Sequence, residues 1–469
     1  MKSIIFGIGN YYQEQKEKLY RFNEIEIMAF TDNNSLLWGQ KLNDILIISP
    51  DKIQTFAYDN VLIMSIHVCD IYNQLRSLGV DEKRIVSWEQ FCKEQRKNDI
   101  RLIGAVKKED TIRKKVLIVT QDLKYDGGSL AAIYAAKALN DSRISVALMV
   151  PNGNETLIRE VTKQEIVIAI CPSLPYIFEI QKRWIEQFDA VIVNLFTMVE
   201  SAFEISKIRP TLWWIHEASI IYKPIMMKYI ACFQQFDMSK ISIYAVSDIA
   251  RQNFNREYKH AIRNTLSVSI PDVAGINSDE KCRTEKIVFA IIGTVHPLKA
   301  QDIFLKSASI VGNEMKSEFW VIGRMEDNEY CRNIKEMAVN IESVKVLGEL
   351  TRADIERCFR DIDVLVCVSQ EETLSMTVIE AMMLEKVCIT TENTGIADYI
   401  QNGVNGFVIP HNNITALTEK MQWIIENRDR AQKIGQEARK TYEKYFTMDV
   451  FSKNIQKALI EIIEKWSGS

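Results

Sequence analysis

Two glutamates separated by seven residues, Glu372 and Glu380, are the residues of this 469-residue chain that point most directly to chemistry. A continuous apolar run at residues 364–368 precedes them, which is typical of a buried parallel strand. Residues 376–384 are apolar almost all round, which predicts a helix buried in a large core. Open α/β sheets bind ligands where such a strand leads through a short loop into a helix.

The residue types in this segment suit a ligand that contains a phosphate and two polyols. Backbone N–H groups of the loop and of the helix N-terminus can bind a phosphate. Glu380, one turn into the helix, can accept hydrogen bonds from ribose hydroxyls, and Glu372, at the mouth of the loop, can reach a second polyol. The alternative is structural, with Glu380 near a helix dipole and Glu372 solvated in a loop.

Residues 369–383 resemble the Glu-x7-Glu motif of family 4 glycosyltransferases. That resemblance implies an α/β protein with the GT-B fold, in which two doubly wound Rossmann-like domains face a cleft. It also implies that Glu380 binds the ribose of a sugar nucleotide and that Glu372 contacts the donor sugar. The loop that would hold the diphosphate through its backbone consists of Thr373, Leu374, Ser375 and Met376.

A second segment supports the resemblance only in part. Lys299 matches the lysine of the family's Gly-Arg…Lys-Gly segment, in which Arg and Lys neutralise the leaving diphosphate. Thr294 stands where the family has the Arg, and Ala300 replaces a Gly. One cation is therefore missing, unless Arg324 supplies it. The loop ending at Leu350 resembles the family loop whose backbone reads the base.

In the middle of the chain, Gly127 and Gly128 precede a predicted helix and resemble the family's glycine-rich loop, which faces the donor diphosphate and the acceptor. His216 lies at the carboxyl end of a predicted strand, the edge where ligands bind in such sheets. The family often has a His there, beside the sugar and the acceptor, although a cap or packing role is the alternative. Ser247 is expected to be a helix N-cap.

The bulk composition limits the function classes. The formal net charge is −4, with 47% hydrophobic and 26% charged residues, so nucleic acid is not expected as a main ligand. Nine cysteines are scattered without a Cys-x-x-Cys pair, which favours a reducing compartment and gives no support to a zinc site. No apolar window approaches the length of a spanning helix, and no signal peptide is expected. We expect a cytoplasmic protein, at most peripheral to the inner face of the cell membrane.

Pattern changes along the chain predict five parts. They are a Rossmann-like accessory domain at 1–96, a linker at 97–113, the acceptor domain at 114–285, the nucleotide-sugar domain at 286–449, and a final helix at 450–469 that packs back on the acceptor domain. The linker is mixed in charge, with many basic residues. It fits a solvated segment or, alternatively, contact with an anionic membrane surface.

The accessory domain alternates strands and helices, which predicts a parallel sheet. Gly7 and Gly9, together with Asp32, resemble part of a dinucleotide fingerprint. Tyr12 occupies the position of the third glycine, where a small residue would allow close helix approach. Docking to a partner, or formation of a homo-oligomer, is therefore preferred over a second nucleotide site.

The resemblance implies a retaining hexosyltransferase that uses a nucleotide sugar, with a UDP-sugar expected, and no metal or other cofactor. A saccharide or a lipid-linked saccharide of bacterial surface polysaccharide or glycoconjugate synthesis is the expected acceptor. Residues 220–230 form either a core helix or a surface that faces a membrane-bound acceptor. Thr294, and a loop without glycine at residues 373–375, leave open a non-catalytic GT-B protein that binds a nucleotide sugar or stabilises a partner glycosyltransferase. A sugar-nucleotide epimerase shares the fold, but the glutamate pair argues against it.

Overall fold

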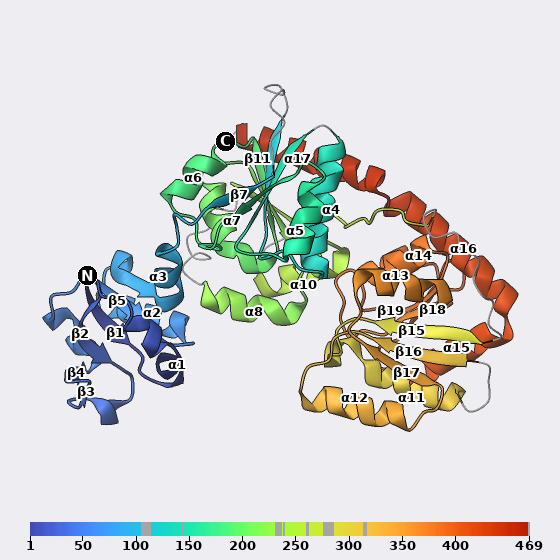
Figure 1. Ribbon diagram of the computed structural model, residues 1–469, viewed down its shortest axis with the longest axis horizontal. Coiled ribbons are helices and arrows are strands. Elements are labelled where there is room, and N and C mark those ends of the chain that lie inside the picture. Colours follow the sequence, from blue (N-terminus) through green and yellow to red (C-terminus); the bar gives the residue numbers. More distant parts are fainter. Residues whose placement is uncertain are drawn as a thin grey trace.

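The computed structural model describes residues 1–104, 114–142, 144–229, 237, 240–258, 262–274, 286–312 and 317–467. In these residues the strands form three sheets that follow one another along the chain. Figure 1 shows the N-terminal unit beside the middle one, and the C-terminal unit on the other side of the middle unit. Each sheet is flanked by helices, as the alternation of strands and helices in the sequence predicts.

The N-terminal sheet has the strand order β3-β4-β2-β1-β5-β6. All of its strand pairs are parallel except β3 with β4. The winding of the chain reverses between β1 and β5, which lie side by side. The predicted alternation of strands and helices is present, and it includes the short strands β3, β4 and β6. The elements are β1 (Lys2–Phe6), α1 (Asn10–Leu19), β2 (Glu26–Thr31), β3 (Lys41–Leu42), β4 (Ile45–Ile48), β5 (Asn60–Ile63), α2 (Val68–Ser77), β6 (Ile85–Ser87) and α3 (Trp88–Glu94).

The middle sheet has the strand order β14-β13-β12-β11-β8-β9-β10-β7. Its helices pack on both faces through apolar side chains that form one large core. The strands are β7 (Arg101–Ile103), β8 (Lys115–Val119), β9 (Ser145–Val150), β10 (Val167–Ile170), β11 (Ala190–Asn194), β12 (Thr211–Ile215), β13 (Ile241–Ala245) and β14 (Asn264–Thr265). The helices are α4 (Gly127–Asp141), α5 (Glu155–Thr162), α6 (Glu179–Ile185), α7 (Val199–Ser206), α8 (Ser219–Lys228) and α10 (Asp248–Tyr258).

The stretch at 97–113, predicted as a linker, contains a strand of the middle sheet. β7 pairs antiparallel with β10 and forms the edge of that sheet. Only three residues contribute, and two of them are exposed, so the hydrophobic pattern that marks a buried strand is absent from the sequence. Residues 105–113 of the predicted linker lie outside the described residues. The middle sheet therefore begins earlier in the chain than the sequence predicts.

The C-terminal sheet is parallel, with the order β17-β16-β15-β18-β19-β20. Its strands are β15 (Ile287–Ile292), β16 (Ser317–Ile322), β17 (Val344–Gly348), β18 (Val364–Cys367), β19 (Val387–Thr391) and β20 (Phe407–Ile409). Its helices are α11 (Gln301–Val311), α12 (Glu329–Val339), α13 (Arg352–Asp361), α14 (Met376–Met383), α15 (Ile414–Glu426) and α16 (Arg428–Tyr445). The apolar run at 364–368 and the apolar segment at 376–384 thus form the buried strand and the buried helix that the sequence predicts.

The last helix, α17 (Met448–Ser467), leaves the C-terminal unit and packs on the middle one, as Figure 1 shows. The Ser452 hydroxyl donates to the carbonyl of Ala138 in α4 at 3.0 Å. The Tyr244 hydroxyl of β13 donates to the Glu461 carboxylate at 2.8 Å. This helix therefore ties the two larger units together at their backs. In the described part of the chain, no helix combines the length and the apolar character that crossing a membrane requires.

The N-terminal unit is attached to the middle one through α3 and α8. Lys228 at the end of α8 pairs with Glu89 of α3 at 2.8 Å. The ammonium of Lys93 donates to the carbonyl of Pro172 at 3.0 Å. Both contacts are polar, so the junction differs from the apolar cores on either side of it.

The edge strand β7 leads to a prediction about truncated chains. We expect a chain that starts at Asn98 to melt at a higher temperature than one that starts at Asp110, because only the former keeps the strand that covers β10. Both should still bind UDP, because both keep all of the residues at the edges where the middle and C-terminal sheets face each other. Calorimetric melting, UDP titration and light scattering on the two chains and the full chain test this. Equal melting temperatures would show that β7 adds nothing to the middle sheet.

Candidate functional site

Lys299 and Glu372 form an ion pair at the carboxyl edge of the C-terminal sheet. Lys299 ends the short turn that follows β15, and Glu372 follows β18, the strand that pairs with β15. The two side chains keep 35% and 15% of their surface exposed. Burial lowers the pKa of the Lys299 ammonium, but the Glu372 carboxylate and the nearby Cys367 together raise it by more, so the net pKa lies above the usual value. Lys299 is therefore a fixed positive charge at this edge.

Glu380 forms a second ion pair, with Arg352. Glu380 lies one turn into α14 and is only 3% exposed. Arg352 is the first residue of α13 and also bonds Glu356 at 3.0 Å. Burial raises the pKa of the Glu380 carboxyl, and the Arg352 guanidinium only partly opposes this, so the net pKa lies above its usual value. Arg352 was not predicted, because nothing in the sequence marks which of many arginines reaches a residue 28 positions away.

Glu371 joins the C-terminal unit to the middle one. Its carboxylate accepts hydrogen bonds from the backbone N–H and the hydroxyl of Ser219, both at 2.6 Å. It also accepts from the Asn253 side-chain amide at 2.6 Å. Ser219 begins α8 and Asn253 lies in α10, so one carboxylate holds two helices of the facing unit. Glu371 was not predicted, because no sequence pattern distinguishes its role from that of its neighbour Glu372.

The two units approach closely beside this contact. The Thr373 hydroxyl donates to the carbonyl of His216 at 2.6 Å. A Cβ added at Gly395 would lie 1.9 Å from the Thr373 carbonyl oxygen and 2.6 Å from the Ser247 hydroxyl oxygen. Ser247 in turn accepts from the backbone N–H of Ala250 at 3.2 Å, which confirms the predicted N-cap. We call the contacts of Glu371, Thr373 and Gly395 with the middle unit the seam.

His216 follows β12 and lies on the seam with its ring inside the protein. The ring centroid is 4.3 Å from that of Trp214. Nε2 is buried and has no hydrogen-bond partner in the structure as described. Burial lowers the pKa of the imidazole to about 3. The ring is therefore neutral at physiological pH, and Nε2 is left available for a polar group of a ligand.

Glu217, next in the chain, organises the same strand ends. Its carboxylate accepts from the backbone N–H of Phe196 at 2.6 Å and from that of His216 at 2.9 Å. Burial raises the pKa of the carboxyl to about 7, although these backbone hydrogen bonds lower it. Sequence reasoning missed this role, since a Glu after a strand is common in solvated turns.

The predicted glycine pair begins α4 and faces α14. A Cβ added at Gly127 would lie 3.8 Å from the sulfur of Met376, the first residue of α14. A Cβ added at Gly128 would approach a Leu195 methyl group to 2.9 Å, so the Leu195 side chain would have to move. The first residues of α4 and α14 therefore lie close together, and each helix N-terminus carries a partial positive charge.

The remaining predicted residues lie around this point. Leu374 and Ser375 are buried in the loop before α14, and Leu350 is half-buried against the core that also contacts Met376. Thr294 is exposed after β15, and Arg324 is exposed at the end of the adjacent β16, where it pairs with Glu326 at 3.2 Å.

Lys124, which the sequence analysis did not select, lies on the loop before α4. Hydrogen bonding to Asp122 raises the pKa of the Lys124 ammonium, and the nearby positive charge of Arg324 lowers it. Lys124 pairs with Asp122, and Arg324, which pairs with Glu326, is close enough to Lys124 to act on its pKa. Within the described ranges, no three His, Cys, Asp or Glu side chains are grouped so that they could hold a metal ion.

The raised pKa of Glu217 predicts a dependence of stability on pH. The carboxyl has a pKa of about 7 in the folded protein and a usual value of 4.5. Between these values the folded state keeps a proton that the unfolded state has released, so stability falls as pH rises from 4.5 to 7. We expect the melting temperature of the natural protein, minus that of Glu217→Gln, to decrease between pH 5 and pH 8. A difference that is constant with pH would contradict the buried, proton-binding carboxyl.

Two family models match the chain. Residues 276–441 match the model described as Glycosyl transferases group 1. Residues 1–86 match the model described as C2185-like, N-terminal. The second match covers all six strands of the N-terminal sheet except the last residue of β6.

Curated relatives cover only parts of the chain. The poly(ribitol-phosphate) alpha-N-acetylglucosaminyltransferase of Staphylococcus aureus (strain COL) is 28% identical over 182 residues, which are 38% of this chain and 36% of that protein. The capsular polysaccharide biosynthesis glycosyltransferase CapM of Staphylococcus aureus is 26% identical over 257 residues, which are 50% of this chain and 67% of that protein. The chain thus spans about a third of the length of the first relative.

Solved structures resemble the larger two units together. Anabaena Alr3699/HepE in complex with UDP and glucose superposes with a TM-score of 0.63 at 15% identity, over 74% of this chain and 100% of that one. TarM superposes with a TM-score of 0.59 at 12% identity, over 75% of this chain and 99% of that one. At these identities the likeness concerns the fold, which is GT-B, preceded by a smaller Rossmann-like unit.

Proposed function

We propose that this chain, whose residues 276–441 form a glycosyl transferases group 1 domain, is a retaining hexosyltransferase of family 4. It would move a sugar from a UDP-sugar to a saccharide or lipid-linked saccharide of a bacterial surface polysaccharide or glycoconjugate. The observation that carries the proposal is the ion pair between Lys299, at the end of the turn after β15, and Glu372, in the loop that leads into α14, with Glu380 buried one turn into that helix. The S. aureus relatives named above support the polysaccharide context.

The donor site follows from these contacts. The diphosphate would lie against the N-termini of α4 and α14 and beside Lys299, where backbone N–H groups and a fixed cation favour an anion. Glu380 would accept the ribose hydroxyls while the ion pair with Arg352 orients its side chain. The Anabaena structure, which holds UDP and glucose in the same fold, supports UDP as the nucleotide.

The chemical step requires stabilisation of negative charge. Breaking the bond between the anomeric carbon and the donor diphosphate leaves that charge on a phosphate oxygen. Lys299 and the helix N-termini are in place before the reaction, so no reorganisation is needed when the charge develops. Arg324, whose carbonyl accepts from the backbone N–H of Val295 next to Thr294, is our first candidate for the cation that Thr294 cannot supply, and Lys124 is the second. His216 would contribute as a neutral hydrogen-bonding ring, and no metal ion or other cofactor is expected.

A second candidate function is a non-catalytic protein that binds a nucleotide sugar or stabilises a partner glycosyltransferase. It is favoured by exposed Thr294 at the position of a cation and by the engagement of Glu372 with Lys299. The two functions differ in one observable, which is release of nucleotide from a donor.

The decisive assay is incubation with a panel of UDP- and GDP-sugars, with and without chelator and saccharide acceptors. We expect slow release of UDP that persists in chelator. Lys299→Met should lower the release rate by about 100-fold, because one preorganised charge facing the transition state is lost. The double variant Lys299→Met/Glu372→Gln, in which no unpaired carboxylate remains, should recover most of any lost melting temperature but not the rate. No release with any donor would favour the non-catalytic function.

Binding of the nucleotide is tested separately at Glu380. Hydrogen bonds to a charged acceptor contribute about 1.5–3 kcal/mol each, so Glu380→Ala should weaken UDP binding at least about tenfold by calorimetry. Glu356→Ala is the matched control, since Glu356 bonds the same Arg352 at 3.0 Å but is 37% exposed. The control should bind UDP almost as the natural protein does. Equal affinity in both variants would remove Glu380 from the donor site.

A further inference from the structure

The N-terminal unit contains a cavity of about 590 Å³ that the proposed transfer reaction does not use. It opens at the carboxyl ends of β1 and β5, beside Gly7, Gly9 and Met64. The winding of the chain reverses between these two strands. This is the place where open α/β sheets hold ligands.

The backbone at this edge is arranged around the cavity. Gly7 has φ of +94°, and a Cβ there would lie 2.9 Å from the Met64 carbonyl oxygen. Tyr12, the residue that argued against a ligand, is 1% exposed and packs edge-on against Phe30 at 5.6 Å. It does not line the cavity. The sequence-based objection therefore concerns the packing of α1 and leaves the cavity open.

The lining of the first cavity has hydrogen-bonding groups of both kinds but little positive charge, and the two lysines of the crevice, Lys223 and Lys228, line only the second cavity. Glu14, Asp32 and Asp70 supply carboxylates, and Asn10 and Asn33 supply amides. Asp32 already accepts from the backbone N–H groups of Ile8 and Asn34, at 3.0 and 2.9 Å. Helices α1 and α2 both begin here without a side-chain cap, so they offer backbone N–H donors. No lysine or arginine is among the described residues that line it. Three carboxylates would repel a phosphate, whereas a neutral polyol can both donate to them and accept from the N–H groups.

A second cavity, of about 580 Å³, continues the first toward the middle unit. The two share Tyr11, Ser65, Ile66, His67 and Asp70. Tyr11 provides an aromatic ring, and Ile66 is 76% exposed, so apolar faces accompany the polar groups. Such a combination suits a sugar ring, which has hydroxyls at its rim and C–H groups on its faces.

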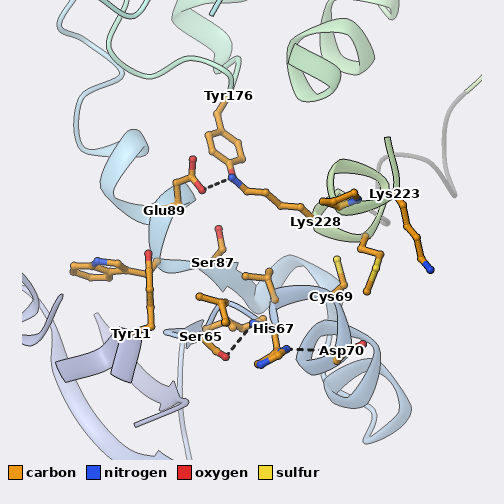
Figure 2. A pocket seen from close by; sticks show the side chains of 16 residues that line it. Tyr11, Ser65, His67, Cys69, Asp70, Ser87, Glu89, Tyr176, Lys223 and Lys228 are labelled. Atoms are coloured by element: carbon orange, nitrogen blue, oxygen red, sulfur yellow. Dashed lines mark hydrogen bonds and ion pairs between the residues drawn. The ribbon is translucent and has the colours of Figure 1, made fainter. Parts of the chain in front are cut away.

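The far wall of the second cavity belongs to α8. Figure 2 shows Lys228 reaching from α8 to Glu89 across the pocket, with Tyr176 beside them. The other end of α8 begins at Ser219, which is bonded to Glu371 on the seam. A ten-residue helix is about 15 Å long, so the crevice lies roughly one helix length from Glu371 and its neighbour Glu372.

We propose that this crevice, formed by the two cavities, binds a neutral stretch of the saccharide acceptor, and that the N-terminal unit thereby holds the acceptor for transfer at the seam. The identity of the saccharide as acceptor rests on the proposed function. The binding of a neutral saccharide by the crevice does not, because it follows from the lining alone.

Gly9 allows a clean test. A Cβ there meets nothing within 4 Å, and its φ of −75° suits any residue, so Gly9→Leu fills the cavity without backbone strain. Gly9→Ala alters the same helix cap but leaves most of the space, and is the matched control. The probes are neutral trisaccharides of glucose, of galactose and of N-acetylglucosamine, observed by saturation-transfer NMR with the full chain. We expect a saturation-transfer signal on at least one probe. This signal should remain with Gly9→Ala and disappear with Gly9→Leu.

Three further measurements distinguish saccharide binding in the crevice from nucleotide binding at the proposed donor site. Asp70→Asn should weaken the same signal, because Asp70 lines both cavities. Glu380→Ala should leave it intact, so a failure of the proposed donor site would not affect it. UDP should not compete with the trisaccharide. The proposal would be overturned by the absence of a saturation-transfer signal on every probe, or by a signal that is unchanged in Gly9→Leu. Displacement of the trisaccharide by UDP would also overturn it and would indicate a second nucleotide site.

Discussion

Three carboxylates lie within ten residues of one loop and helix, and the fold has to compensate the cost of removing each of them from water. An ionised carboxylate loses far more hydration on burial than a single contact returns, so each needs a specific partner. Glu371 is bonded to Ser219 and Asn253, Glu372 to Lys299, and Glu380 to Arg352. These partners come from four elements, namely α8, α10, the turn after β15 and α13, and their positions fix how the two larger units and the loop lie together.

The same ion pairs hold the side chains of the site in the positions that an anionic, polyhydroxylated ligand requires. Lys299 and Arg352 are held by carboxylates, so neither has to be ordered when a donor arrives. A diphosphate would share Lys299 with Glu372, and a ribose would share Glu380 with Arg352. His216 stays uncharged because burial holds its pKa near 3, so it does not compete with those cations for the phosphate.

The sequence predicts the parts of this arrangement that depend on local pattern. The apolar run before Glu372 and the apolar helix around Glu380 are visible because burial on all sides leaves a continuous hydrophobic signal. Lys299 was predicted from its own segment, but its pairing with Glu372 was not, and neither Arg352 nor Ser219 was singled out, because these partners lie 73, 28 and 152 positions away in the chain. The strand β7 was missed for the opposite reason, since a short and exposed edge strand carries almost no hydrophobic pattern. Tyr12 was read as an obstacle to a ligand, while its ring packs against Phe30 within the core.

The seam has a consequence for recombination among related proteins. Gly395 has no space for a side chain because Thr373 and Ser247 lie against it, and Ser247 belongs to the other unit. Glu371 likewise depends on Ser219 and Asn253 of that unit. A chimera that joins the C-terminal unit of this chain to the middle unit of a relative would place unmatched surfaces together at this point. Swapping units between relatives therefore requires that the residues of the seam be exchanged together, wherever the two chains are joined.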